Sequence, residues 1–270
     1  MLIKLYPDDE MLHQHPFTHS EVPYNLIHLI SSNERNFCLR SRDGNFIFAQ
    51  TPGHNAWVWV DENVDDTEAQ NLIKELIERV EDVELPGLSG EPEFIEKLAS
   101  AYSLARNVSY RTDMLMESYF CLSVKPPVKV SATLIKASNE YIETIAQFCA
   151  GFACDAYGTY VEPSSQLSDA KHMVSTENLY LLFADSTPVS MANIAHRSAR
   201  HARINAVYTP PENRKKGYAS AAVAKLCDIV NKEGLQPMLY ADMKNPDSNK
   251  VYKNIGFVES GKIADIKFSK

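Results

Sequence analysis

The sequence lacks any long apolar run. In 270 residues, no window approaches the length of a membrane span. Residues 1–10 include no apolar segment long enough for a secretory signal. We therefore expect a cytoplasmic protein with no membrane partner.

Cysteines are few and ungrouped. The chain has five, scattered and without C-x-x-C spacing: Cys38, Cys121, Cys149, Cys154 and Cys227. This pattern argues against a disulfide framework and against a zinc site, so no metal is predicted. Cys149 and Cys154 lie in or beside an apolar helix, where we expect small core residues rather than nucleophiles.

Positive charge is in deficit. The chain has 27 Lys and Arg residues against 35 Asp and Glu, a formal net charge of -8. Such a balance argues against a nucleic-acid partner and is compatible with a cationic amine substrate. The length exceeds that of one typical domain and suggests two.

The two commonest phosphate-binding fingerprints, a complete G-x-x-x-x-G-K-[ST] and a G-x-G-x-x-G, are missing as well. Residues 207–220 nevertheless combine a strand end, a short cationic loop and the start of a helix. The helix is predicted by the spacing of Ala219, Ala222, Val223, Leu226, Ile229 and Val230. Its unpaired first amides, its dipole and the loop cations all favour an anion, and Gly217 allows close backbone approach. The alternative is an exposed basic turn before an ordinary helix.

The loop Arg214-Lys-Lys-Gly217-Tyr-Ala219 resembles the [QR]-x-x-G-x-[GA] signature of the GNAT acetyltransferase superfamily. In that family the signature wraps the pyrophosphate of acetyl-CoA. The resemblance therefore implies a coenzyme site formed by Val207, Tyr208, Arg214, Lys215, Lys216, Gly217, Tyr218, Ala219 and Ser220. Amides near Val207 and Tyr208 could also stabilise the oxyanion of the reaction.

A second matching block occupies residues 239–257 and reads as strand, cap and helix. Asn245 before Pro246 suits a helix N-cap, and Gly256 suits a left-handed exit. The resemblance makes Asn245 or Asn249 a ligand of the coenzyme arm and places Tyr252 near the sulfur. The alternatives are a simple cap at Asn245 and a core aromatic at Tyr252.

Acetyl transfer to an amine requires both a base and an acid. The ammonium must lose a proton before it attacks the thioester, and the departing thiolate needs one. Tyr252, neutral at pH 7, is the candidate acid. Residues 201–208 carry no carboxylate where some family members place a glutamate. Glu162 and Asp242 are candidate proton acceptors, although solvated carboxylates are the commoner outcome.

The histidines near this strand are not assigned to the chemistry. His196 and His201 flank Arg197-Ser-Ala-Arg200, which reads as a hairpin turn. We expect both histidines to be exposed turn residues rather than a catalytic pair.

Paired prolines at Lys125-Pro-Pro-Val128 suggest a boundary between domains 1–125 and 129–270. The second domain reads as strand 131–133, helix 139–156, helix 167–174, strands 179–184, 188–195 and 203–208, the two blocks above, and strand 263–268. This order is that of a GNAT fold: a mixed α+β domain whose mostly antiparallel sheet is flanked by helices.

The first domain repeats the pattern at an offset of about 150 residues. Strands are predicted at 37–41, 46–50 and 57–60, followed by a helix bearing Leu72, Ile73, Leu76, Ile77 and Val80. Carboxylates in Glu62-Asn-Val-Asp-Asp66 replace the cationic loop; they suit the helix dipole and would repel a phosphate. We interpret residues 1–125 as a degenerate GNAT-like domain without coenzyme; the alternative is an unrelated α+β domain.

The resemblance implies an acetyl-CoA-dependent N-acetyltransferase that works by direct transfer in a ternary complex, without metal. A small-molecule amine is the expected acceptor. The alternative function is a non-catalytic acyl-CoA-binding sensor or scaffold, in which Tyr252 is structural. Nothing in the sequence indicates the oligomeric state.

Overall fold

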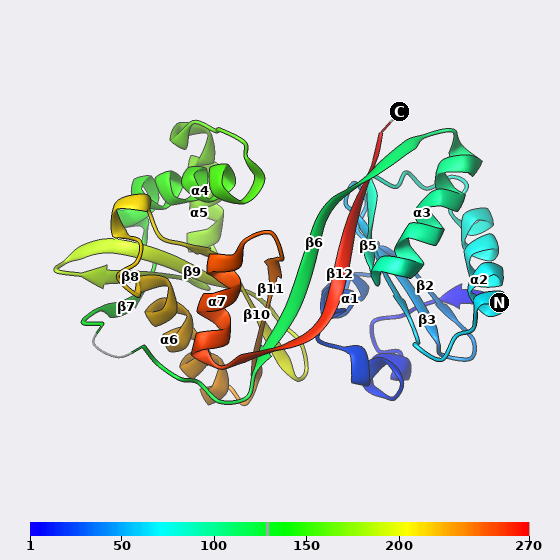
Figure 1. Ribbon diagram of the computed structural model, residues 1–270, viewed down its shortest axis with the longest axis horizontal. Coiled ribbons are helices and arrows are strands. Elements are labelled where there is room, and N and C mark those ends of the chain that lie inside the picture. Colours follow the sequence, from blue (N-terminus) through cyan, green and yellow to red (C-terminus); the bar gives the residue numbers. More distant parts are fainter. Residues whose placement is uncertain (128–129, 270) are drawn as a thin grey trace. The chain divides into compact units, whose positions relative to one another are not determined.

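A computed structural model describes residues 1–127 and 130–269 (Figure 1). Val128 and residue 129, at the expected domain boundary, lie outside the described residues, as does residue 270. The chain forms two compact units. The first contains Met1–Tyr119, Tyr240–Asn245 and the chain from Glu259 onward, and the second contains Phe120–Leu239 and Pro246–Val258.

The same order of elements occurs twice along the chain. The first series is β1 (Leu2–Lys4), η1 (Glu10–His13), η2 (Phe17–Ser20), α1 (Leu26–Ser31), β2 (Phe37–Ser41), β3 (Phe46–Gln50), β4 (Ala56–Val60), α2 (Asp66–Arg79), β5 (Gly87–Gly90), α3 (Pro92–Arg106) and β6 (Ser109–Cys121). The second is β7 (Thr133–Lys136), η3 (Asn139–Tyr141), α4 (Ile142–Tyr157), η4 (Pro163–Gln166), α5 (Leu167–Ser175), β8 (Leu179–Ala184), β9 (Thr187–Arg197), β10 (His201–Tyr208), η5 (Pro211–Asn213), α6 (Tyr218–Lys232), β11 (Gln236–Asp242), α7 (Pro246–Ile255) and β12 (Phe257–Ser269). In each series a strand and helical segments precede three strands, and α–β–α–β follows.

Strand pairing follows the same plan in both series. β2, β3 and β4 form an antiparallel run, and β4 pairs in parallel with β5. β8, β9 and β10 form the corresponding antiparallel run, and β10 pairs in parallel with β11. The expected mixed, mostly antiparallel fold flanked by helices is confirmed, and the repeated layout agrees with the expected duplication.

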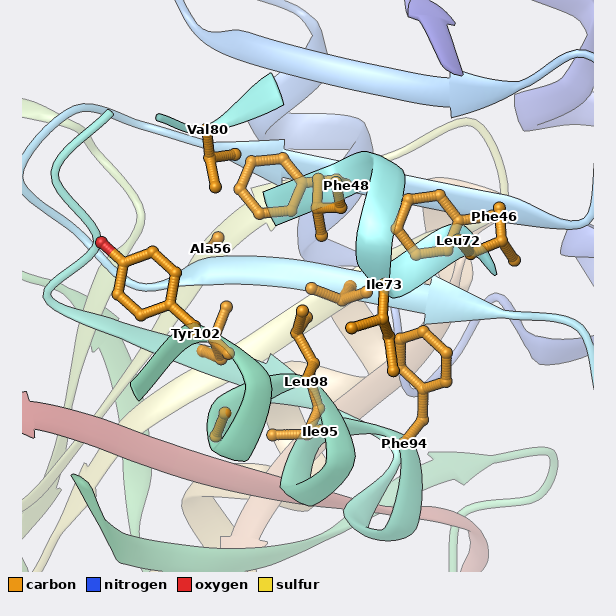
Figure 2. Packing of buried hydrophobic residues seen from close by; sticks show 14 of the residues in the cluster. Phe46, Phe48, Ala56, Leu72, Ile73, Val80, Phe94, Ile95, Leu98 and Tyr102 are labelled. Atoms are coloured by element: carbon orange, nitrogen blue, oxygen red, sulfur yellow. The ribbon is translucent and has the colours of Figure 1, made fainter. Parts of the chain in front are cut away.

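One apolar cluster of the first unit lies between two helices and the sheet. Figure 2 shows side chains of α2 and α3 directed at those of β3 and β4. Among them, Phe46, Phe48, Leu76 and Ile95 are almost completely buried. The predicted stripe on α2 therefore faces the core. As expected, a carboxylate caps the start of this helix: the Asp65 side chain accepts a hydrogen bond from the Glu68 N–H at 2.9 Å.

The sheet of the second unit is covered on both faces. α4 and α5 pack on one face of β8–β10, where Leu179, Leu181 and Met191 are buried (Figure 1). α6 packs on β8–β10 through its own buried face, which includes Ala222, Val223 and Leu226. Most predicted elements of this unit lie within one to three residues of those observed. The predicted strand 131–133 is displaced, because the pairing with β8 involves Thr133–Lys136.

The last strand of the chain is divided between the units. Its residues Ala264–Lys267 pair antiparallel with β5 of the first unit, where β12 lies between β5 and β6. Ile263 and Ile266 are 0% and 1% exposed and belong to the first unit's two apolar clusters. The first unit is therefore completed by residues from the end of the sequence.

Candidate active site

β10 contains a bulge just before the cationic loop. Asn205 pairs with Asn193 and Tyr208 with Met191, so three steps along β10 match two along β9. Ala206 has a φ of 47°, rare for a residue with a side chain. A bulge leaves one residue outside the ladder and turns the strand. The bulge falls at the end of the strand where the oxyanion-binding amides were predicted.

The loop after β10 has the backbone shape of an anion site. Lys215 and Gly217 have φ angles of 61° and 82°. Left-handed residues that alternate with ordinary ones direct successive N–H groups into one concavity. The Lys215 and Lys216 side chains are exposed beside it. The loop residues predicted from the sequence are thus brought together at a concave backbone segment with two lysine side chains beside it.

The N-terminus of α6 opens onto this loop. Gly217 is the N-cap, no side chain caps the helix, and its first turn holds no acidic residue. The first intrahelical bond runs from Ala221 N–H to Gly217 C=O at 2.9 Å. The amides of Tyr218, Ala219 and Ser220 therefore precede the helical ladder and suit an anionic ligand.

Gly217 is required by its position as well as by its backbone angle. A β-carbon there would lie 2.9 Å from Cγ2 of Val130. A side chain would meet this methyl group and would also strain a left-handed backbone. The loop backbone therefore packs against Val130 at a position that only glycine can occupy without strain.

Arg214 differs from the two lysines. Its Nε donates to the Thr209 carbonyl at 3.0 Å, its Nη2 pairs with an Asp155 carboxylate oxygen in α4, and its guanidinium lies 5.9 Å from the centre of the Tyr208 ring. The side chain is thus engaged within the protein. Burial, and then the nearby Asp155 carboxylate, raise the pKa of Tyr208, while Arg214 acts in the opposite direction.

Tyr208 joins the end of β10 to α4. Its carbonyl accepts a hydrogen bond from Ser190 Oγ at 2.8 Å, and its ring packs 5.7 Å from Phe148. Its hydroxyl occupies the space that a side chain at Gly151 would take. Glycine in the middle of α4 therefore lets the tyrosine lie against the helix backbone.

The second block forms α7 and its flanks. Pro246 begins the helix, as predicted, and Gly256 follows it with a φ of 109°. Asn245 is exposed and Asn249 is half-buried. Tyr252 is 8% exposed, with its ring 6.0 Å from Phe257 in an edge-on arrangement. Packing and a catalytic role are both compatible with this position.

Residues 145–257 match the family model described as the acetyltransferase (GNAT) family. Residues 145–257 therefore form a GNAT-family domain. The matched region spans the bulged strand, the loop and α7, and the match supports an acyl-transferring enzyme.

Solved structures resemble the whole chain in fold. A GNAT-family acetyltransferase from Colwellia psychrerythraea is 10% identical with a TM-score of 0.59, covering 99% of this chain and 98% of its own. A GCN5-related N-acetyltransferase from Sphaerobacter thermophilus is 11% identical with a TM-score of 0.61, covering 99% and 95%. A Drosophila protein is 14% identical with a TM-score of 0.65, covering 99% and 98%. No curated protein sequence matches significantly.

The candidate bases of the GNAT domain have local partners. Glu162 is exposed and accepts the Tyr160 hydroxyl at 2.9 Å. Asp242 is half-buried, and its carboxylate accepts the Lys244 N–H at 2.9 Å. Neither contact assigns a base.

Two sequence-based expectations near the GNAT site are wrong. His196 and His201 are each only 7% exposed, because both lie on paired strands rather than in the turn. His196 Nδ1 accepts from Arg203 Nε at 3.3 Å, and His201 Nε2 lies 3.1 Å from Gln236 Oε1. Cys154, expected in the core, is exposed, whereas Cys149 is half-buried.

Sequence reasoning missed Asp155 and Gly151 of the GNAT domain. A glycine inside a helical pattern was an available signal of close packing. Nothing local distinguished Asp155 from other surface carboxylates. In the described ranges 1–127 and 130–269, no cluster of three or more His, Cys, Asp and Glu side chains suits a metal, and no helix is long and apolar enough to cross a membrane.

Proposed function

We propose that the protein is an acetyl-CoA-dependent N-acetyltransferase that acts on a primary amine of a small molecule. The observation that carries this proposal is the concave backbone at Lys215–Gly217 leading into the uncapped start of α6. A pyrophosphate is an anion of the right kind for these amides and for the exposed lysines. The sequence has neither of the two commonest phosphate-binding fingerprints, and the loop is consistent with a coenzyme pyrophosphate instead.

In the proposed reaction the amine attacks the thioester carbonyl within a ternary complex. The new C–N bond forms, the oxyanion is stabilised by amides at the bulged end of β10 near Val207 and Tyr208, and the C–S bond breaks on collapse. The amine loses a proton to a base or to water, and the thiolate gains one. Tyr252 is the proposed donor of that proton.

Residues of both sequence blocks contribute to the proposed coenzyme site. The amides of Lys215, Lys216, Gly217 and the first turn of α6 would hold the pyrophosphate. Asn245 or Asn249 would bind the pantetheine arm. We further propose that residues 1–125 form a degenerate GNAT-like domain without coenzyme, since Asp65 caps α2 where the second series has Gly217.

The test is calorimetric titration of the full chain with acetyl-CoA, followed by thiol release against a panel of small amines and peptides. Binding with thiol release for a small amine is the expected result. Binding without release on any panel member would favour the non-catalytic acyl-CoA-binding alternative. The lack of a carboxylate on β10 also favours that alternative. No binding would contradict the proposal.

The role of Tyr252 is tested with Tyr252→Phe, which keeps the ring that packs on Phe257. If the hydroxyl protonates the thiolate, we expect kcat to fall by about 100-fold while the Kd for acetyl-CoA is unchanged. Thiol-release kinetics and calorimetry measure the two quantities. An unchanged kcat would remove Tyr252 from the mechanism.

A further inference from the structure

The side chain of Arg214, in the coenzyme loop, bonds to other residues of the protein. Its Nε bond to the Thr209 carbonyl closes the segment Thr209–Arg214 on itself. Its Nη2 pairs with Asp155, and the two side chains are 41% and 45% exposed. The pair therefore joins two segments that are far apart in the sequence: the coenzyme loop and the end of α4.

The end of α4 is suited to hold a cation. Asp155 lies in the last turn of the helix, which ends at Tyr157. The C-terminal end of a helix dipole carries partial negative charge, so the helix and the carboxylate both attract the guanidinium. An arginine donates from separate nitrogens of a rigid planar group, whereas a lysine donates from a single nitrogen at the end of a flexible chain. Arg214 has this geometry: its Nε donates to the Thr209 carbonyl and its Nη2 to the Asp155 carboxylate.

Backbone bonds from Asn213 N–H to the Pro210 carbonyl at 2.9 Å and from Arg214 N–H to the Pro211 carbonyl at 3.2 Å turn the chain just before the concave residues. Lys215 and Gly217 are in left-handed conformations, which lie outside helix and strand ladders, and Lys215 and Lys216 are exposed. An anion site made of backbone amides works only if the amides are held in place before the ligand arrives. The Arg214 side chain supplies such a restraint immediately before the concave residues.

We propose that Asp155 is a positioning residue of the coenzyme loop, acting through Arg214. The identity of the ligand rests on the proposed function. The restraint on the loop does not.

The proposal and a simple charge effect predict opposite signs. Asp155→Asn removes a negative charge near a polyanionic ligand, so charge alone would strengthen coenzyme binding. Loss of a restraint would weaken it. Because the pair is partly exposed, we expect the Kd for acetyl-CoA to rise about threefold.

Arg214→Lys separates geometry from charge. It keeps the positive charge but loses the rigid planar group whose two nitrogens reach Thr209 and Asp155, so it should weaken binding as much as Asp155→Asn does. The double variant should be no weaker than either single one, because both substitutions break the same contact. Glu212→Gln, an equal charge change in the same loop, is the control and should leave the Kd unchanged or slightly lower.

The decisive measurement needs no ligand. Amide hydrogen exchange in residues 211–221 of the free protein should be faster in Asp155→Asn and Arg214→Lys than in the wild type, and unchanged in Glu212→Gln. Unchanged exchange in both variants would overturn the proposal. Tighter binding by Asp155→Asn, together with binding by Arg214→Lys more than tenfold weaker, would overturn it as well and make Arg214 a direct phosphate ligand.

Failure of the two proposals is distinguishable. If the wild-type protein does not bind acetyl-CoA, the proposed function is wrong, and the exchange data still decide whether Asp155 restrains the loop.

Discussion

At the scale of single residues, the packing of Tyr208 depends on Gly151. A glycine inside a helix costs about 1 kcal/mol relative to alanine, so its presence in α4 calls for a reason. The reason is the tyrosine hydroxyl, which lies where a β-carbon would stand. The glycine lowers the stability of the helix, but it allows β10 and α4 to approach closely.

We predict that Gly151→Ala destabilises the second unit by about 1–3 kcal/mol, because the overpacking outweighs the gain in helix propensity. Chemical denaturation followed by far-ultraviolet circular dichroism measures the change. Tyr208→Leu removes the clashing atoms, so the double variant should be less destabilised than the sum of the two single changes. A stabilised Gly151→Ala protein would contradict the packing argument.

The sequence predicted which loop residues come together but not where every side chain points. The spacing of Arg214, Gly217 and Ala219 was enough for the loop, because backbone geometry follows from glycine and the helix start. The direction of Arg214 depends on Asp155, 59 residues earlier, which no local pattern reveals. His196 and His201 were misassigned because burial on a strand is decided by the neighbouring strands.

At the scale of elements, an ion pair with two hydrogen bonds joins the end of α6 to the β9–β10 hairpin. Arg197 donates from Nε and Nη2 to the two carboxylate oxygens of Glu233 at 2.6 and 2.9 Å, and from Nη1 to Asn178 Oδ1 at 2.8 Å. The hydrogen bonds from Arg197 lower the pKa of Glu233. Helix α6, which begins at the cationic loop, is thus fixed at its far end.

We predict that Glu233→Gln lowers the free energy of unfolding by about 0.5–1 kcal/mol at pH 7, a modest value because both side chains are one-third exposed. The folded-state pKa of Glu233 is depressed, so the contribution is complete above the unfolded pKa of about 4.3 and is lost as pH falls through the folded value. Denaturation of both proteins at pH 7 and at pH 3 measures this. A difference that persists at pH 3 would contradict the assignment.

Elements with a clear apolar period could be predicted, and others could not. α2 and α6 follow the apolar stripes predicted for them, and β2, β3 and β4 lie within one residue of the predicted strands. α3 carries a usable stripe, with Phe94, Ile95, Leu98 and Tyr102 buried, and was not predicted. β6 has an exposed first half without alternation, so its pattern was weak.

At the scale of the whole molecule, the two series of elements are alike but the last strand is divided. Duplication was visible in the sequence as repeated element order. The pairing of β12 with β5 was not, because strand neighbours far apart in the chain leave no local mark. A domain boundary near residue 125 therefore remains a prediction about the sequence, while the first unit also contains residues 240–245 and those from 259 onward.

We predict that removing the residues after Val258 unfolds the first unit. Exposing Ile263 and Ile266 alone would forfeit about 3–6 kcal/mol, a large share of the stability of a typical domain. Both tryptophans of the chain, Trp57 and Trp59, lie in β4 of this unit, so intrinsic fluorescence reports its unfolding. Lys262→Ala, exposed on the same strand, is the control. Native-like fluorescence of the truncated protein would contradict the prediction.

The divided strand also has a consequence for synthesis on the ribosome. Residues 1–119 leave the exit tunnel first, yet residues 264–267, which pair with one of the two edges of β5, are made much later. At ordinary translation rates the interval is on the order of ten seconds. During it the edge of β5 is open to any other strand, including that of a neighbouring nascent chain. Folding of the first unit is therefore completed only after residues 264–267 have been made, so this chain cannot fold strictly in the order in which it is made.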